Sequence, residues 1–403
     1  MKKIICIFLT LLLASLLFCL PASAALAVEP DYDYTRLKDA GITLNVYNWG
    51  LYISDGSDDS VNVIKEFEAR TGIKVNYTTY DTNESMYAKI KSGGADYDVI
   101  IPSDYMIGKM AQEGMLEKLD FANIPNYAMI GAQYKGLSYD AGEEYSVPYT
   151  WGTVGIVYNT TMVEGEIDSW NALWDGAYTG NVLMFNNSRD AFAIAAIKLG
   201  MSLNPSTVED VEKMAAELKK QKSIVQAYVM DEIFDKMASG EAALAPYYAG
   251  DAITMIGDNP DLAFVIPKEG TNYFVDAMCI PAGSKNKEAA EIFINYMCES
   301  EVALANCEFV GYSTPQIKAE QMLPEELKNS PIMYPNAKIL ENTEVFSVLP
   351  DEINTAMDEA WSGMKAHEEG GSGWIVPVLL VIAVGVIVLV FWRKNEQKKR
   401  NDY

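Results

Sequence analysis

The sequence predicts an α/β protein, because segments typical of strands and of amphipathic helices alternate along most of its 403 residues. Two uncharged apolar runs frame this region. One follows a basic N-terminus, and the other extends from Trp374 to Phe391 near the C-terminus. We therefore expect an extracytoplasmic α/β domain between a signal peptide and one membrane-spanning helix.

Residues 1–24 have the three parts of a secretory signal peptide. Lys2 and Lys3 form the basic start, an apolar stretch follows, and the small residues Ala22-Ser23-Ala24 provide a cleavage site. The mature chain is therefore expected outside the cytoplasm.

Residues 374–392 are long enough to cross a bilayer, and Trp374 and Trp392 stand at the two edges, where interfacial aromatics are common. The basic tail, 393–403, is then cytoplasmic by the positive-inside rule. The glycine-rich residues 367–373 are predicted to form a flexible tether. The alternative for the apolar segment is a buried core helix.

Composition excludes several classes of function. The formal net charge of −25 argues against a basic patch for nucleic acid. The single histidine, His367, is the first residue of the predicted tether, which argues against histidine metal sites and Ser-His-Asp catalysis. We expect no metal and no other cofactor. Three cysteines follow the signal peptide; free buried thiols are expected, with a Cys298–Cys307 disulfide as the alternative.

The first predicted strand begins at Ile42, where apolar and polar residues alternate, and it ends at Asn48 and Gly50. Trp49 and Tyr52 stand at its carboxyl end, which is where ligands bind in open α/β sheets. The two aromatics are predicted either to wall a ligand cleft or to cap the sheet.

Strands and helices then alternate up to residue 114. Predicted helices span 60–70, 83–91 and 105–114, and predicted strands span 73–80 and 97–101. This order predicts a parallel sheet whose strands end on one side. Ser103 and Tyr105 follow the third strand, so they share a rim with Trp49, which favours the cleft.

A second α/β region follows Pro148. Its predicted strands span 154–159, 181–185, 242–248, 262–266 and 271–280, and its predicted helices span 191–199, 208–220, 231–239, 286–297, 301–306 and 349–367. Asp190 is either a ligand contact or an ordinary acid in the first turn of a helix capped by Asn187 or Ser188. Asp276 lies inside an apolar strand, where an unpaired carboxylate is costly, so we expect it to have a partner.

Spaced motifs carry a further signal: Tyr47-Asn48-Trp49-x-x-Tyr52, Thr71-Gly72-Ile73-Lys74-Val75, Val99-Ile100-Ile101-Pro102-Ser103, Pro148-Tyr149-x-Trp151-Gly152 and Phe274-x-Asp276. With these motifs, the chain resembles the spermidine/putrescine-binding proteins of ABC transporters, a branch of the type II periplasmic-binding-protein fold. The similarity covers roughly residues 42–361.

The resemblance implies a two-lobed clamp that closes on a polyamine and catalyses nothing. Lobe 1 would comprise residues 42–148 and 277–315, and lobe 2 would comprise residues 149–276 and 316–366. Bound polyamines would lie between aromatic rings, with carboxylates on their ammonium groups. Carried over by position, the aromatic walls would be Trp49, Tyr52, Tyr248, Phe274 and Tyr312, the polar contacts Ser103 and Tyr105, and the acids Asp190, Asp251 and Asp276.

The chain also departs from the family pattern. Leu51 stands where an acid is usual, Asn187 where a carboxylate is usual, and Phe346 where spermidine binders have a glutamine. Tyr248 and Phe274 stand where some members have tryptophan. One end of a long polyamine would then lack an acid unless Asp104 compensates, so the choice between putrescine and spermidine stays open.

The implied partners are a polyamine, the permease subunits of an ABC transporter and the lipid bilayer, and the ectodomain is expected to be monomeric. One alternative is that the same fold binds another small organic cation or solute. A second alternative is a membrane-anchored sensor ectodomain.

Overall fold

The computed structural model describes residues 32–93 and 96–366. They form an α/β fold around a mixed ten-stranded sheet of order β2-β1-β3-β9-β4-β7-β5-β6, in which β10 pairs with β9 and β8 pairs with β4. The strands are β1 (Thr43–Trp49), β2 (Lys74–Tyr80), β3 (Val99–Ile100), β4 (Ser146–Asn159), β5 (Val182–Phe185), β6 (Val225–Val229), β7 (Leu244–Tyr248), β8 (Leu262–Val265), β9 (Thr271–Cys279) and β10 (Thr343–Glu344).

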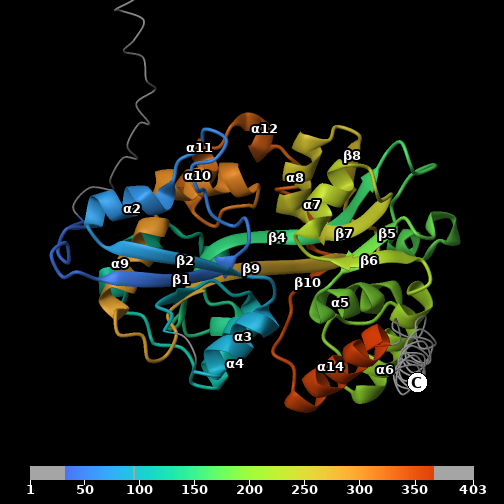
Figure 1. The fold of residues 1–403 in the computed structure, drawn as a ribbon, viewed down its shortest axis with the longest axis horizontal. Coiled ribbons are helices and arrows are strands. Elements are labelled where there is room, and N and C mark those ends of the chain that lie inside the picture. Colours follow the sequence, from blue (N-terminus) through green and yellow to red (C-terminus); the bar gives the residue numbers. More distant parts are fainter. Residues whose placement is uncertain (1–31, 94–95, 367–403) are drawn as a thin grey trace, which may run out of the picture. The chain divides into compact units, whose positions relative to one another are not determined.

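Helices connect most of these strands (Figure 1). They are α2 (Val63–Thr71), α3 (Asn83–Lys91), α4 (Asp104–Gln112), α5 (Ser188–Lys198), α6 (Val208–Gln221), α7 (Glu232–Ala238), α8 (Ala249–Asp258), α9 (Lys287–Met297), α10 (Ser300–Val310), α11 (Ile317–Met322), α12 (Glu325–Lys328), α13 (Ala337–Leu340) and α14 (Asp351–Ala366). The chain divides into two compact units. One comprises Met1–Asn204 and Gln221–Val348 and contains the sheet; the other comprises Pro205–Lys220 and Leu349–Tyr403 and contains α14 and nearly all of α6.

The first three strands form the predicted parallel group. β1 pairs in parallel with β2 and with β3, and its inward residues Leu44 and Val46 are fully buried. The helix α2 begins at the cap residue Asn62 and ends at Gly72, which adopts the left-handed conformation that glycine tolerates best. Because β1, β2 and β3 point the same way, their carboxyl ends lie at one edge of the sheet.

Two long antiparallel strands, β4 and β9, run side by side through the centre of the sheet (Figure 1). β9 also pairs with β3, and β4 also pairs with β7 and β8. The sequence predicted the second half of β4 only. The strand starts earlier, at Ser146, because a register shift between Pro148 and Thr150 accommodates the proline, which has no N–H to donate.

The other parallel group consists of β7, β5 and β6. The carboxyl ends of these three strands also lie at one edge, and a helix begins after each of them. Asn187 caps α5 by accepting a hydrogen bond from the N–H of Arg189. The strand β6 and the helix α8 were not predicted. α8 follows β7 without a loop, and its first turn contains Gly250, a residue that usually indicates a break.

Cys279, Cys298 and Cys307 are free and buried, as expected, so the alternative Cys298–Cys307 disulfide is absent. Among the described residues, none of the helices combines the length and the apolar surface that a bilayer crossing requires. The predicted signal peptide, tether, membrane span and basic tail (1–24, 367–373, 374–392 and 393–403) lie outside the described residues.

Candidate functional site

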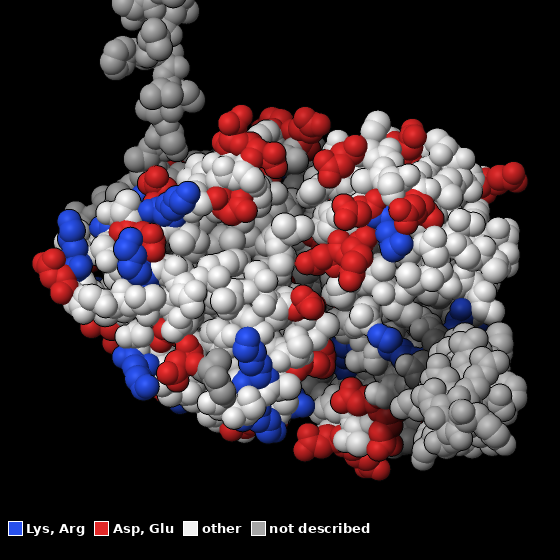
Figure 2. All heavy atoms as spheres, in the orientation of Figure 1, with Lys and Arg blue, Asp and Glu red and all other residues white. Residues whose placement is uncertain are grey.

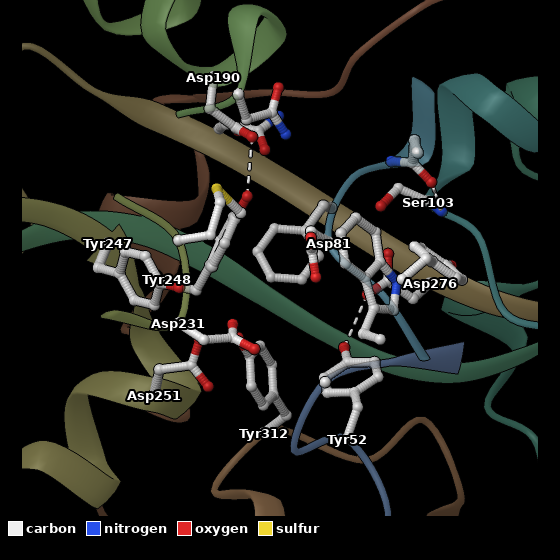
Figure 3. Close-up of a pocket in the computed structure, with 18 of the residues that line it drawn as sticks. Tyr52, Asp81, Ser103, Asp190, Asp231, Tyr247, Tyr248, Asp251, Asp276 and Tyr312 are labelled. Atoms are coloured by element: carbon white, nitrogen blue, oxygen red, sulfur yellow. Dashed lines mark hydrogen bonds between the residues drawn. The ribbon is translucent and has the colours of Figure 1, made fainter. Parts of the chain in front are cut away.

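A cavity lies where the carboxyl ends of the two parallel groups of strands face the middle of β9 (Figure 3). It encloses about 660 Å³, open solvent at its mouth included. Its lining consists of Trp49, Gly50, Tyr52, Tyr80, Asp81, Asn83, Ser103, Tyr105, Asn187, Asp190, Met230, Asp231, Tyr247, Tyr248, Asp251, Asn272, Phe274, Asp276, Tyr312 and Phe346.

All ten residues that the sequence singled out as ligand contacts line this one cavity: Trp49, Tyr52, Ser103, Tyr105, Asp190, Tyr248, Asp251, Phe274, Asp276 and Tyr312. The aromatics Trp49 and Tyr52 therefore wall a cavity, as the first of the two interpretations of this strand end requires. Contact with a ligand remains a prediction for each of the ten.

The charge of the lining is entirely negative. Five aspartates line the cavity, and no lysine, arginine or histidine occurs among the described lining residues. Three of the five were expected from the sequence; Asp81 and Asp231 were not. Acidic side chains also gather over α7 and α8 on the face drawn in Figure 2. Glu232, Asp235 and Asp258 of these two helices are exposed.

Asp276 lies in the middle of β9 and is 4% exposed. The hydroxyl of Tyr52 donates a hydrogen bond of 2.7 Å to its Oδ2, which provides the expected partner. Its other oxygen, Oδ1, is buried and has no hydrogen-bond partner among the described residues. Burial raises the pKa of Asp276 to about 6, although the Tyr52 hydroxyl opposes the change.

Asp190 lies in the first turn of α5, and it also faces the cavity, so its two interpretations are compatible. The hydroxyl of Tyr248 donates a hydrogen bond of 2.8 Å to its Oδ2. Burial raises the pKa of Asp190 to about 7.

Asp251 has the same arrangement in the first turn of α8, where the hydroxyl of Tyr312 donates a hydrogen bond of 2.8 Å to Oδ2. Burial raises the pKa of Asp251 to about 7 as well. The Tyr312 ring packs directly on the backbone of Gly250, where a Cβ atom would lie 2.2 Å from ring atom Cδ2. Glycine is therefore required for this close approach.

Aromatic rings form a continuous wall beside the carboxylates. Tyr52 and Tyr312 meet edge to face with centroids 4.9 Å apart, Tyr312 and Phe274 are 6.2 Å apart, and Phe274 and Tyr248 are 5.6 Å apart. Such rings bind methylene groups by apolar contact and cations through their faces.

Asn83 forms hydrogen bonds with both predicted polar contacts. The hydroxyl of Tyr105 donates a hydrogen bond of 2.8 Å to Glu84 and accepts one of 3.1 Å from the amide of Asn83. The backbone N–H of Ser103 donates to the same Asn83 side chain at 3.2 Å. Asn83 thus holds both residues at the rim, a role that the sequence did not indicate.

Asp104 does not compensate for Leu51. It is fully buried and is not among the described residues that line the cavity. Its carboxylate accepts hydrogen bonds from the backbone N–H groups of Tyr105 at 2.7 Å and Val275 at 3.4 Å. Burial, together with the nearby charge of Asp276, raises its pKa to about 8. Leu51 itself is 62% exposed and lies outside the cavity lining.

The described residues contain no group of three or more His, Cys, Asp or Glu side chains arranged to hold a metal ion. The arrangement that is present, several carboxylates beside aromatic rings, suits an organic cation with more than one positive charge.

Comparison with known proteins agrees with this site. The profile of the bacterial extracellular solute-binding proteins matches residues 62–335. The spermidine/putrescine-binding periplasmic protein of Escherichia coli (strain K12) is 35% identical over 309 residues, which are 76% of this chain and 87% of the relative.

Solved structures show the same relationship. A Listeria monocytogenes structure described as a spermidine/putrescine ABC transporter aligns with a TM-score of 0.77 and 38% identity, over 81% of this chain and 99% of its own. The spermidine/putrescine ABC transporter substrate-binding protein of Streptococcus pneumoniae aligns with a TM-score of 0.68 and 37% identity, over 81% and 99%. The chain therefore belongs to the bacterial extracellular solute-binding proteins and has their periplasmic-binding-protein-like α/β fold.

Proposed function

We propose that this chain is the extracytoplasmic receptor of an ABC transporter and that it captures a polyamine, putrescine or spermidine, for delivery to a permease. The observation that carries the proposal is the charge of the cavity, which has five aspartates and no basic residue among its described lining. The names of the relatives, which include spermidine/putrescine-binding and putrescine-binding proteins, agree with a polyamine.

The chemistry of the lining explains the choice of ligand. Polyamines carry ammonium groups separated by methylene chains. Asp190, Asp251 and Asp276 offer carboxylates to the ammonium groups, and the rings of Phe274 and Tyr312 offer apolar surface to the methylenes between them. An anionic solute would meet only repulsion from these carboxylates, so we exclude it as the cargo.

The proposed action is closure of two lobes, 42–148 with 277–315 and 149–276 with 316–366. β4 and β9 would supply two of the three crossings between these parts of the chain, and the third would lie at residues 315–316. Residues from both sides contribute to the cavity, for example Tyr52 on one side and Asp251 on the other. A cation bound between them would favour the closed arrangement, because it neutralises carboxylates that otherwise repel one another.

We test this function by calorimetric titration of the full chain with putrescine, spermidine and spermine. Binding of at least one amine is expected, and Asp251→Asn is expected to weaken it strongly. The matched control is Asp258→Asn, which removes an exposed carboxylate from the same helix outside the cavity lining. No heat with any of the three amines, or equal losses in the two variants, would refute the proposal.

We also propose that the receptor is held at the membrane by residues 374–392 after removal of the signal peptide 1–24. Such a tether would raise the concentration of the receptor beside its permease. A chain truncated before Trp374 should be released into the medium, and the cells should take up polyamine more slowly. Retention on the cells, or unchanged uptake, would contradict the tether.

A further inference from the structure

Asp231 is a cavity residue whose position has no local explanation. It directly precedes α7, where an aspartate usually accepts a capping hydrogen bond from the helix backbone, but its side chain makes no such bond. The carboxylate lies instead against Gly50 in the loop after β1, where a Cβ atom would be only 2.4 Å from Oδ2. The glycine thus leaves room for a carboxylate from a segment about 180 residues away in the chain.

Asp81 lies at the end of β2 and lines the same cavity. It follows Tyr80, which pairs with Trp49 across β1 and β2, so Asp81 leaves the sheet beside Gly50, the residue against which the Asp231 carboxylate lies. The negative charge of Asp81 also contributes, after burial, to raising the pKa of Asp231. Neither carboxylate forms an ion pair with a lysine or arginine in the described part of the chain. Two like charges of this kind provide a site for a cation between them.

The five aspartates that line the cavity differ in burial. Figure 3 shows Asp190 beside α5 and Asp231 next to Asp251. Asp190 and Asp276 are buried, Asp251 is half-buried, and Asp231 and Asp81 are exposed. The interior of the cavity therefore contains Asp190 and Asp276, and Asp231 and Asp81 lie at its mouth.

We propose that Asp81 and Asp231 form an outer ammonium site, so that the receptor binds a linear triamine such as spermidine more tightly than the diamine putrescine. This inference rests on the proposed function. The inner carboxylates hold two ammonium groups, and the unpartnered Oδ1 of Asp276 is available to accept one of them. When the inner carboxylates hold both ammonium groups of a diamine, none remains to bind Asp81 and Asp231. A triamine has a third ammonium group, which can bind these two carboxylates.

The test compares two ligands on matched variants of the full chain. Asp231→Asn and Asp81→Asn are each titrated calorimetrically with spermidine and with putrescine. Spermidine binding is expected to weaken about tenfold or more, the size of a hydrogen bond between charged groups, while putrescine binding changes less than about twofold. The control, Asp235→Asn, removes an exposed carboxylate of α7 outside the cavity lining and should change neither affinity.

A second variant, Gly50→Ala, keeps every carboxylate but adds the Cβ atom that would collide with Asp231. It is expected to reproduce the selective loss of spermidine affinity with an unchanged melting temperature. Equal effects on the two amines, unchanged spermidine affinity in the aspartate variants, or a wild-type chain that prefers putrescine would overturn the outer site. A wild-type chain that binds neither amine would instead overturn the proposed function.

Discussion

Polyamine binding should weaken when the pH falls from 8 to 6. The pKa values of Asp190 and Asp251 are about 7, and that of Asp276 is about 6, because the cavity buries these carboxyl groups. An ammonium group binds their ionised forms. The protons that they hold near neutral pH must therefore leave when the ligand binds, so affinity rises with pH.

The size of the effect follows from these values. Between pH 8 and pH 6, a group of pKa about 7 changes from mostly ionised to about nine-tenths protonated, which costs roughly tenfold in affinity. Asp190 and Asp251 together give about a hundredfold, and Asp276 adds about twofold. The ligand does not contribute, because alkyl ammonium groups like that of lysine titrate near pH 10.

The assay is calorimetric titration at pH 6, 7 and 8, in two buffers that differ in heat of protonation. At pH 7, release of about one proton per bound ligand is expected. Asp190→Asn should remove about half of that release, and the exposed Asp258→Asn should not change it. An affinity that is flat from pH 6 to 8, or a binding heat independent of the buffer, would refute the reasoning.

Two other substitutions have defined outcomes. Gly250→Ala should weaken polyamine binding about tenfold or more by displacing the Tyr312 ring, whereas Gly257→Ala in the same helix meets no atom within 4 Å and should bind normally; equal affinities would contradict the close packing. Asp276→Asn should stabilise the empty protein at pH 8 by up to about 3 kcal/mol, because a pKa raised to about 6 means that the fold disfavours the charged form. Thermal melting should show this gain vanish near pH 4, and a gain that persists there would contradict it.

The sequence predicted the first parallel group of strands well, because alternation in β1 and β2 and the capping signals of α2 and α3 are local features. The rule that ligands bind at the carboxyl ends of strands then brought Trp49 and Ser103 together. β4 was predicted too short because Pro148 argues against a strand, and only the pairing with β9 shows that a register shift accommodates it.

The missed part of the site depends on contacts between distant segments. In the sequence alone, Asp231 stands where a helix cap is common and Asp81 where a turn residue is common, so no pattern marks them, although Asp231 makes no capping bond in the structure. Asp104 failed as a candidate for a geometrical reason. It follows Ser103 at the start of α4, and the helical twist turns its side chain inward, where it accepts a hydrogen bond from Val275.

The pairing of β4 with β9 places a proposed ligand-binding carboxylate on the same backbone that would bend during closure. Asp276 is opposite Thr150 in this pair, close to the register shift at Pro148. The carboxylate that would bind the polyamine thus belongs to the same short stretch of backbone that must bend if the two lobes close. Ligand binding and lobe closure would then involve the same residues, so no other segment is needed to couple the two events.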